Sequence, residues 1–152
     1  MVQANELRPK NIVKDQYGKN IVVESVGEYG INLTTLEGDL SWDYDLDKIF
    51  GIPLTPEILE RYGFEKKVGD HWRIDSFFEK KINFGNRLIR IDQVKKSKSG
   101  NISFYAFLLE NNKYSFKESA MIGEVEYLHR LQNIWLDFTF QELEIKELQI
   151  TI

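Results

Sequence analysis

The chain of 152 residues contains no cysteine. This absence excludes a disulfide framework, a thiolate nucleophile and any metal site built on thiolates. The sequence also lacks an apolar run of the ~18 residues that a membrane-spanning helix needs. Its first residues, MVQANELRPKN, hold no apolar leader segment. We therefore expect a cytoplasmic protein that does not bind membranes.

Catalytic and metal-binding signatures are missing as well. The two histidines, His71 and His129, lie far apart in the chain, and no glycine-rich phosphate loop, HExxH or GxSxG motif is present. The acidic run DLSWDYDLD at 39–47 fails as a calcium loop because Lys48 and Leu54 stand where glycine and glutamate are required. We expect a solvated strand face there, and a protein that is not an enzyme and needs no metal or cofactor.

No single sign of charge dominates the chain. It has 20 Lys and Arg against 24 Asp and Glu, a net charge of -4, and the two signs are interspersed. This balance gives no general attraction to nucleic acid or to an anionic membrane. Lys95, Lys96 and Lys98 predict a basic hairpin tip, but the loop has no aromatic residue to stack on a base. Nucleic acid is therefore the less favoured class of partner.

Two segments carry explicit helix signals. In GIPLTPEILERYGF at 51–64, Thr55 stands at an N-cap position, Pro56 at the first helical position, and Gly63 at the stop. In the second segment, at 124–138, apolar residues recur at three- and four-residue spacing, which predicts a long helix with one apolar face. Trp135 lies within that face, so we expect it to be buried against a sheet.

The remaining sequence is rich in β-formers. Short runs at 11–14, 20–26, 31–36 and 40–44 are separated by turn residues, which indicates a small SH3-like barrel. Runs at 72–78, 87–94, 102–109 and 114–116 predict a second, antiparallel sheet, and alternation after residue 147 predicts a final strand. Thr139 and Glu142 fit a capping box that would begin one more short turn.

These elements predict an α+β fold. We expect an N-terminal SH3-like small β-barrel subdomain (residues 1–54) and a linking helix (55–67). An antiparallel β-sheet subdomain covered by one long C-terminal helix (68–152) would complete the chain. An apolar content of 42% is sufficient for the cores of one compact domain or two very small ones.

Three segments together resemble a known family. They are NELRPKNIV at 5–13, GIPLTPEILERYGF at 51–64 and VEYLHRLQNIWL at 125–136. They are similar to an uncharacterised family of small proteins encoded by phages and prophages of Bacteroidetes, whose members open with NELRxGN, carry IPLTEEWLxxFGF centrally and close with YVHQLQNLYFALTGEEL. Pro9 and Lys10 replace the usual Ile-Gly, and Phe140 replaces the glycine of TGEEL, which favours a more buried C-terminal turn. The resemblance implies a small phage accessory protein rather than a mechanism.

Four residues are candidate ligand contacts: Trp72, Arg73, His129 and Gln132. Trp72 could stack on a base, Arg73 could meet a phosphate, and the two helical residues could supply hydrogen bonds. Ordinary packing is the competing interpretation for all four. Gln132 falls within the apolar arc of its helix, so its amide would otherwise bond to the backbone of a neighbouring sheet or loop.

The sequence and the resemblance together lead to a functional hypothesis. We expect a non-enzymatic accessory binding protein of a phage or prophage, acting in the host cytoplasm as an antagonist of host defence. It would sequester a host protein or a small signalling molecule such as a nucleotide. A nucleic-acid-associated small-barrel module is the alternative, and a minor metabolic enzyme is the third class. The sequence leaves the oligomeric state open, including a homo-oligomer.

Overall fold

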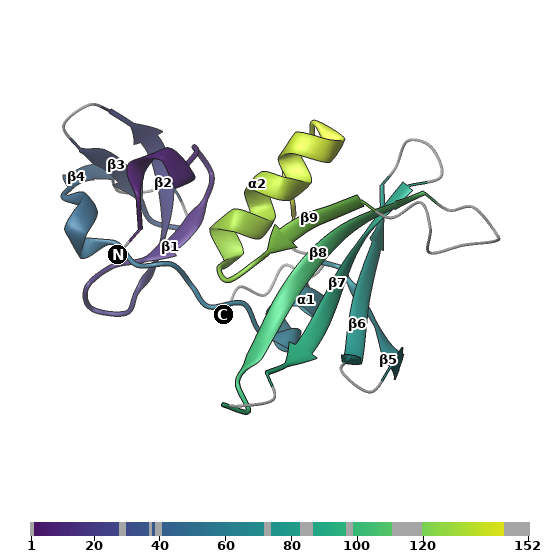
Figure 1. The fold of residues 1–152 in the computed structure, drawn as a ribbon. Helices are drawn as coiled ribbons and strands as arrows, with labels where there is room; N and C mark the ends of the chain where they lie inside the picture. Colours follow the sequence, from purple (N-terminus) through teal and green to yellow (C-terminus); the bar gives the residue numbers. More distant parts are fainter. Residues whose placement is uncertain are drawn as a thin grey trace. The chain divides into compact units, whose positions relative to one another are not determined.

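The computed structural model describes residues 2–27, 30–36, 38, 41–71, 74–82, 87–96, 99–110 and 120–144. Within these ranges the fold is α+β, with two antiparallel sheets and two α-helices (Figure 1). The chain divides into two compact units. The first contains the residues up to Pro53 together with Tyr127–Ile134, and the second contains Leu54–Glu126 and, among the described residues, those from Trp135 to Glu144. The division falls inside the second helix.

The first unit is built on a four-stranded antiparallel sheet in the order β1-β2-β3-β4. The strands are β1 (Ile12–Lys14), β2 (Asn20–Val26), β3 (Ile31–Thr34) and β4 (Ser41–Tyr44). Two short 3₁₀ helices flank the sheet in the sequence, η1 (Ala4–Glu6) and η2 (Leu46–Lys48). These strands occupy the four segments predicted from the β-forming runs.

Side-chain alternation places one face of this sheet against the core of the unit. Val23, Leu33 and Trp42 lie opposite one another on β2, β3 and β4. The core contains mainly aliphatic side chains: Val2, Leu7, Val13, Ile21, Val23, Ile31, Leu33 and Ile49, with Trp42, Tyr44 and Leu46 packed against them. The register of β2 shifts between Val23 and Ser25, and the strand is exposed beyond that bulge.

The described strands of this sheet do not close into a barrel. Beyond η2 the chain returns to β1, where Phe50 and Lys14 form an isolated antiparallel bridge. The backbone N–H of Lys14 donates to the Phe50 carbonyl over 2.8 Å, and that of Phe50 donates to the Lys14 carbonyl over 2.9 Å. A single bridge is too short to be a strand, so the predicted SH3-like closure is not confirmed.

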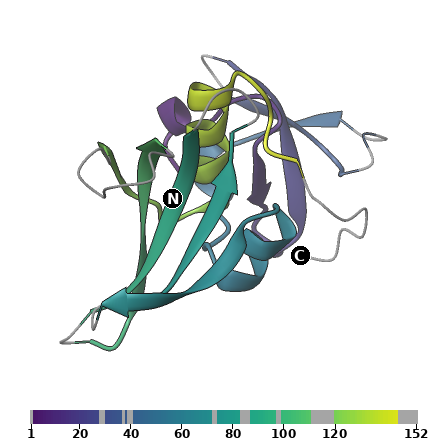
Figure 2. The same ribbon diagram turned by 90° about the vertical axis from the view of Figure 1, so that its right-hand side faces the viewer.

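The second unit begins with α1 (Pro56–Arg61), whose ends follow the sequence signals. Thr55 is the N-cap, and its hydroxyl accepts a hydrogen bond from the backbone N–H of Ile58 over 3.2 Å. Gly63 follows the helix with a φ of 87°, a conformation that glycine adopts without steric cost. A helix therefore lies in the predicted segment, but it ends at Arg61 rather than at residue 67, because Gly63 stops it and β5 begins at Glu65; it lies beside β5 (Figure 2).

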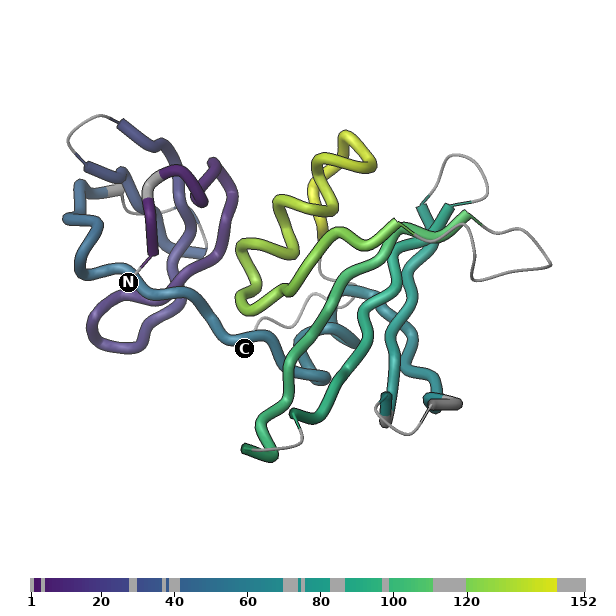
Figure 3. The backbone as a smooth tube through the Cα atoms, viewed as in Figure 1, coloured from purple at the N-terminus to yellow at the C-terminus, as the bar shows by residue number. Residues whose placement is uncertain are grey.

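A five-stranded antiparallel sheet follows in this unit, and each strand pairs with the next one in the chain (Figure 3). The strands are β5 (Glu65–His71), β6 (Ile74–Lys81), β7 (Arg87–Lys95), β8 (Ile102–Glu110) and β9 (Ala120–Glu124). β5 and β9 were not predicted from the sequence. The strands predicted at 114–116 and after residue 147 lie outside the described residues.

The second helix, α2, spans Leu128–Thr139 and is 12 residues long. It is shorter than the predicted helix because Glu124 belongs to β9 and Tyr127 forms a β-bridge with Pro53. The expectation of one long C-terminal helix is therefore not confirmed. Trp135 is only 5% exposed, as predicted. Its ring meets Phe64 edge-on at a centroid distance of 6.1 Å.

The end of α2 differs from the prediction in two respects. The hydroxyl of Thr139 donates to the Trp135 carbonyl over 2.7 Å and accepts from the backbone N–H of Gln141 over 3.1 Å, so it ends α2 rather than beginning another turn. The capping-box prediction is wrong because this hydroxyl already has partners in the last turn. Phe140 is 89% exposed, so the expected burial of this turn is also wrong.

Neither helix of the described chain has the length and apolar character that crossing a membrane requires.

Candidate functional site

The structure describes two of the four predicted ligand-contact residues. Trp72 and Arg73 lie outside the described residues. His129 and Gln132 both lie on the part of α2 that belongs to the first unit, where they are 1% and 4% exposed. Their polar atoms face the opening segment of the chain rather than solvent.

Gln132 bonds to the backbone on both sides of its amide. Its Oε1 accepts from the backbone N–H of Ile12 over 2.9 Å, and its Nε2 donates to the carbonyl of Lys10 over 3.3 Å. The expectation that this amide would bond to a neighbouring loop or sheet is confirmed. A ligand contact through Gln132 would require breaking these bonds, so the predicted four-residue site stays a prediction.

The next residue of α2, Asn133, extends the same network. Its Nδ2 donates to the carbonyl of Glu6 over 2.6 Å, and its Oδ1 accepts from Nδ2 of Asn11 over 2.9 Å. Asn11 in turn accepts from the backbone N–H of Arg8 through Oδ1 over 2.8 Å. The amide side chains of α2 thus hold the turn that leads into β1.

His129 completes the network with a partly satisfied ring. Its Nε2 lies 3.6 Å from Oε2 of Glu6, while its Nδ1 is buried without a hydrogen-bond partner. The ring stacks on Tyr127 at a centroid distance of 5.6 Å. Burial lowers the pKa of His129 below 6.5, against the opposing effect of Glu6 and with a smaller lowering by Arg130. The imidazole is therefore neutral at pH 7.

The central helix segment also reaches this network, through Gly51. A Cβ atom at Gly51 would lie 2.6 Å from ring atoms of Tyr127 and 3.1 Å from Cε1 of His129. The backbone N–H of Leu128 donates to the carbonyl of Ile52 over 2.9 Å. Residues from all three segments that carry the family resemblance therefore meet here. We call them the motif cluster: Glu6, Lys10, Asn11, Ile12, Gly51, Ile52, Tyr127, His129, Gln132 and Asn133.

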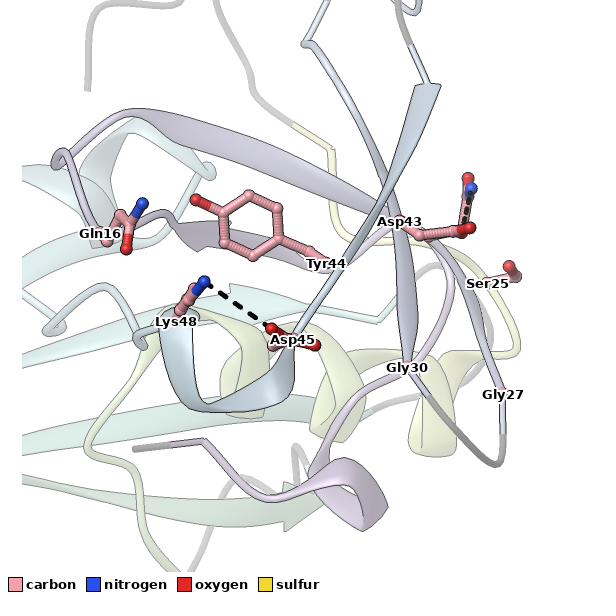
Figure 4. A pocket seen from close by; sticks show the side chains of 9 residues that line it. Gln16, Ser25, Gly27, Gly30, Asp43, Tyr44, Asp45 and Lys48 are labelled. Carbon is pink, nitrogen blue, oxygen red and sulfur yellow. Dashed lines mark hydrogen bonds and ion pairs between the residues drawn. The ribbon is translucent and has the colours of Figure 1, made fainter.

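A second polar region of the first unit is a hollow of about 560 Å³ on the four-stranded sheet (Figure 4). We call it the β4 hollow. It is lined by Gln16, Ser25, Gly27, Gly30, Asn32, Asp43, Tyr44, Asp45 and Lys48. These residues come from the turn after β1, the facing ends of β2 and β3, β4 itself, and η2. None of them belongs to the motif cluster.

The lining side chains project to both sides of β4. Tyr44 and Lys48 lie on one side and Asp43 on the other, as the alternation of a strand requires (Figure 4). Nζ of Lys48 lies 3.7 Å from Oδ2 of Asp45, and Oδ1 of Asp43 accepts from Nδ2 of Asn32 over 3.0 Å. Two carboxylates and one cation leave the hollow with a net negative charge.

Both carboxylates are available to a partner. Asp43 is exposed, and the side chain of Asp45 is 73% exposed. The ring of Tyr44 is half-buried because it also packs against the core of the unit. The arrangement offers hydrogen-bond acceptors and negative charge beside an aromatic ring.

The exposure of this region was predicted from the sequence, but the hollow was not. Asp43, Asp45 and Asp47 are all exposed, as predicted, but they do not share one strand face, because β4 ends at Tyr44 and Leu46–Lys48 form η2. The available signal was the alternation of these aspartates with apolar residues beside a glycine-containing turn at 27–30, which marks a hairpin end. Nothing in local spacing showed that this hairpin end and η2 would border one depression.

Within the described ranges, no three histidine, aspartate or glutamate side chains gather as metal ligands would. Comparisons with protein-family models, with curated proteins and with solved structures found no match to the chain.

Proposed function

We propose that this chain is a non-enzymatic accessory binding protein of a phage or prophage that antagonises host defence by holding a host protein at the β4 hollow. The observation that carries the proposal is the hollow itself. It is a depression with exposed, mixed polar groups around an aromatic ring, which is the chemistry of a recognition surface. We place the protein in the host cytoplasm.

The phage setting rests on the family resemblance, and the backbone supplies an independent reason to favour it. Of the described residues other than glycine, Lys10 and Phe140 have positive φ angles, 71° and 59°. These are the two positions at which this chain replaces a glycine of the family pattern, and glycine is the residue that adopts such angles without steric cost. At both positions the backbone therefore keeps the conformation that glycine would favour, although the residue is no longer glycine.

A protein partner fits the hollow better than a nucleotide does. The carboxylates of Asp43 and Asp45 repel phosphate groups, and the charge of Lys48 is already opposed by Asp45. The same charges argue against the alternative of a nucleic-acid module. At the predicted basic hairpin tip, Nζ of Lys96 lies 3.9 Å from a carboxylate oxygen of Glu124, so that cation is also balanced.

The four-stranded sheet supports an SH3-like arrangement as part of this proposal. Four short antiparallel strands, the 3₁₀ helix η2 and the return of Phe50 to β1 follow in the order expected for such a small barrel. Among the described strands, none pairs with the outer side of β4, and β4 also contributes to the lining of the hollow. A small barrel left open there would expose a strand edge to a partner.

The proposal is tested by native mass spectrometry of the chain purified from infected host cells. We expect a complex with a host protein. The double substitution Asp43→Lys and Asp45→Lys should remove that complex, because it replaces two negative charges of the hollow with positive ones. The matched control is Asp47→Lys, which changes an exposed carboxylate of η2 that does not line the hollow.

Three results would contradict the proposal. They are a chain that carries a nucleotide and no protein, a chain that carries nothing, and a protein complex that the double substitution leaves unchanged. Loss of the complex in the Asp47→Lys control as well would show a general charge effect rather than a specific surface, and would also count against the hollow.

A further inference from the structure

We infer that the β4 hollow takes an extended, basic segment of the partner protein, which adds as a further strand to the outer edge of β4. The inference rests on the proposed function and names the partner's chemistry and its mode of binding. It follows from three observations: an edge of β4 that no described strand pairs with, lining groups on both sides of that strand, and the charge of those groups.

The edge of β4 is unpaired in the described parts of the chain. β4 is the last strand of the sheet order β1-β2-β3-β4 and pairs with β3 from Ser41↔Thr34 to Tyr44↔Ile31. No described strand pairs with its other side, and η2 follows directly after it. A strand edge of this kind presents backbone N–H and C=O groups that an extended peptide can bond.

The hollow has lining groups on both sides of β4, and the rest of its lining comes from the turn after β1, the β2–β3 hairpin end and η2. Its lining includes both Asp43 and Tyr44, which are consecutive residues whose side chains project to opposite sides of β4 (Figure 4). An added strand would likewise send successive side chains to opposite sides. A depression with recognition groups on both sides of one strand therefore matches an extended peptide better than a helix, which would contact one side only.

The charges on both sides select basic residues. On one side stands the exposed carboxylate of Asp43, and on the other the exposed carboxylate of Asp45 beside the ring of Tyr44. A lysine or arginine of the partner could pair with either carboxylate and could also lie over the ring. Two neighbouring basic residues on an extended segment would engage both sides at once.

The test uses random decapeptides displayed on phage and selected on the full chain. We expect enrichment of peptides with neighbouring Lys or Arg residues. The selected peptide, synthesised with a fluorophore, should lose about 10- to 100-fold in affinity for the chain carrying Asp43→Lys and Asp45→Lys. Asp47→Lys should change the affinity by less than about threefold, because an exposed charge outside the hollow is screened by solvent.

Methylation of single backbone nitrogens in that peptide tests strand pairing directly. An added strand bonds to an edge through every second residue, so methylation at alternate positions should weaken binding by about tenfold, and methylation between them should have little effect. Insensitivity to methylation, enrichment of acidic or neutral peptides, or failure to enrich any peptide that depends on Asp43 and Asp45 would overturn the inference. A host-protein complex that still depends on the two aspartates would leave the proposed function standing.

Discussion

The motif cluster and the β4 hollow are both polar regions of the same unit, yet they use their polar atoms in opposite ways. In the motif cluster, the amide of Gln132 is buried and bonds to the backbone at both ends. In the hollow, Asp43 and Asp45 are exposed, and they pair with the side chains of Asn32 and Lys48 at the surface. The segments that make the chain recognisable therefore hold the unit together, while the groups open to a partner lie elsewhere.

The largest expected difference between the two regions is in stability. Gln132→Ala should lower the free energy of unfolding by about 2 to 4 kcal/mol, because it leaves the N–H of Ile12 and the carbonyl of Lys10 without partners. The matched substitution in the hollow is Gln16→Ala, at an exposed glutamine, and it should cost less than about 0.5 kcal/mol. Urea unfolding of both variants measures this difference. Equal losses would break the comparison.

A smaller effect is expected from crowding the motif cluster. Gly51→Ala should cost about 1 to 3 kcal/mol, because the added methyl group would meet the stacked rings of Tyr127 and His129. Gly27 in the hollow is the control, since a Cβ there would have only one neighbour, the Gly30 carbonyl oxygen at an ordinary 3.5 Å. Thermal unfolding of both variants provides the measurement. A neutral Gly51→Ala would show that the rings move aside freely.

The pH dependence of stability should trace to His129. Its folded pKa lies below 6.5, so the unfolded chain binds the proton more readily, and stability is full above that pH and falls as the pH is lowered through the folded pKa. His129→Phe keeps a ring against Tyr127 and removes the titration. Unfolding free energies at about pH 7.5 and 5.5 should fall more in the unsubstituted chain than in the variant. An equal fall in both would assign the dependence to other groups.

The smallest expected effect is a gain. Lys10→Gly should stabilise the chain by about 0.5 to 1 kcal/mol, because glycine adopts a positive φ angle without the steric cost that lysine bears. Glycine also raises the conformational entropy of the unfolded chain, which offsets only part of this gain. Lys19→Gly removes the same charge at an exposed position that has no positive φ angle, and it should destabilise slightly. Chemical unfolding compares the two. A loss of stability in Lys10→Gly would remove one support for the family resemblance.

Local signals explain which parts of the fold could be predicted. Turn residues separate β1 to β4, and Thr55, Pro56 and Gly63 define the ends of α1, so both were predicted from short-range chemistry. β5 was missed because EKKVGDH at 65–71 has little apolar alternation. β5 is an edge strand of its sheet, and edge strands commonly carry charged residues. β9 was missed because its last residue, Glu124, also fits the start of the apolar helical pattern.

The candidate site was harder to predict for a different reason. The polar residues of the HRLQN run were noticeable in the sequence because they interrupt an apolar arc, and this makes a buried structural amide look like a ligand contact. The β4 hollow depends on the spatial meeting of the turn after β1, the β2–β3 hairpin end and η2. No residue spacing within any one of these segments encodes that meeting.

Site-specific photo-crosslinking in host cells tests the central claim most directly. A benzophenone amino acid is placed at Asp45 in the hollow or at Arg130, an exposed residue of α2 beside the buried motif cluster. The account predicts that a host protein is crosslinked from position 45 and not from position 130. Crosslinking from position 130 alone, or from neither position, would contradict the assignment of the β4 hollow as the docking surface.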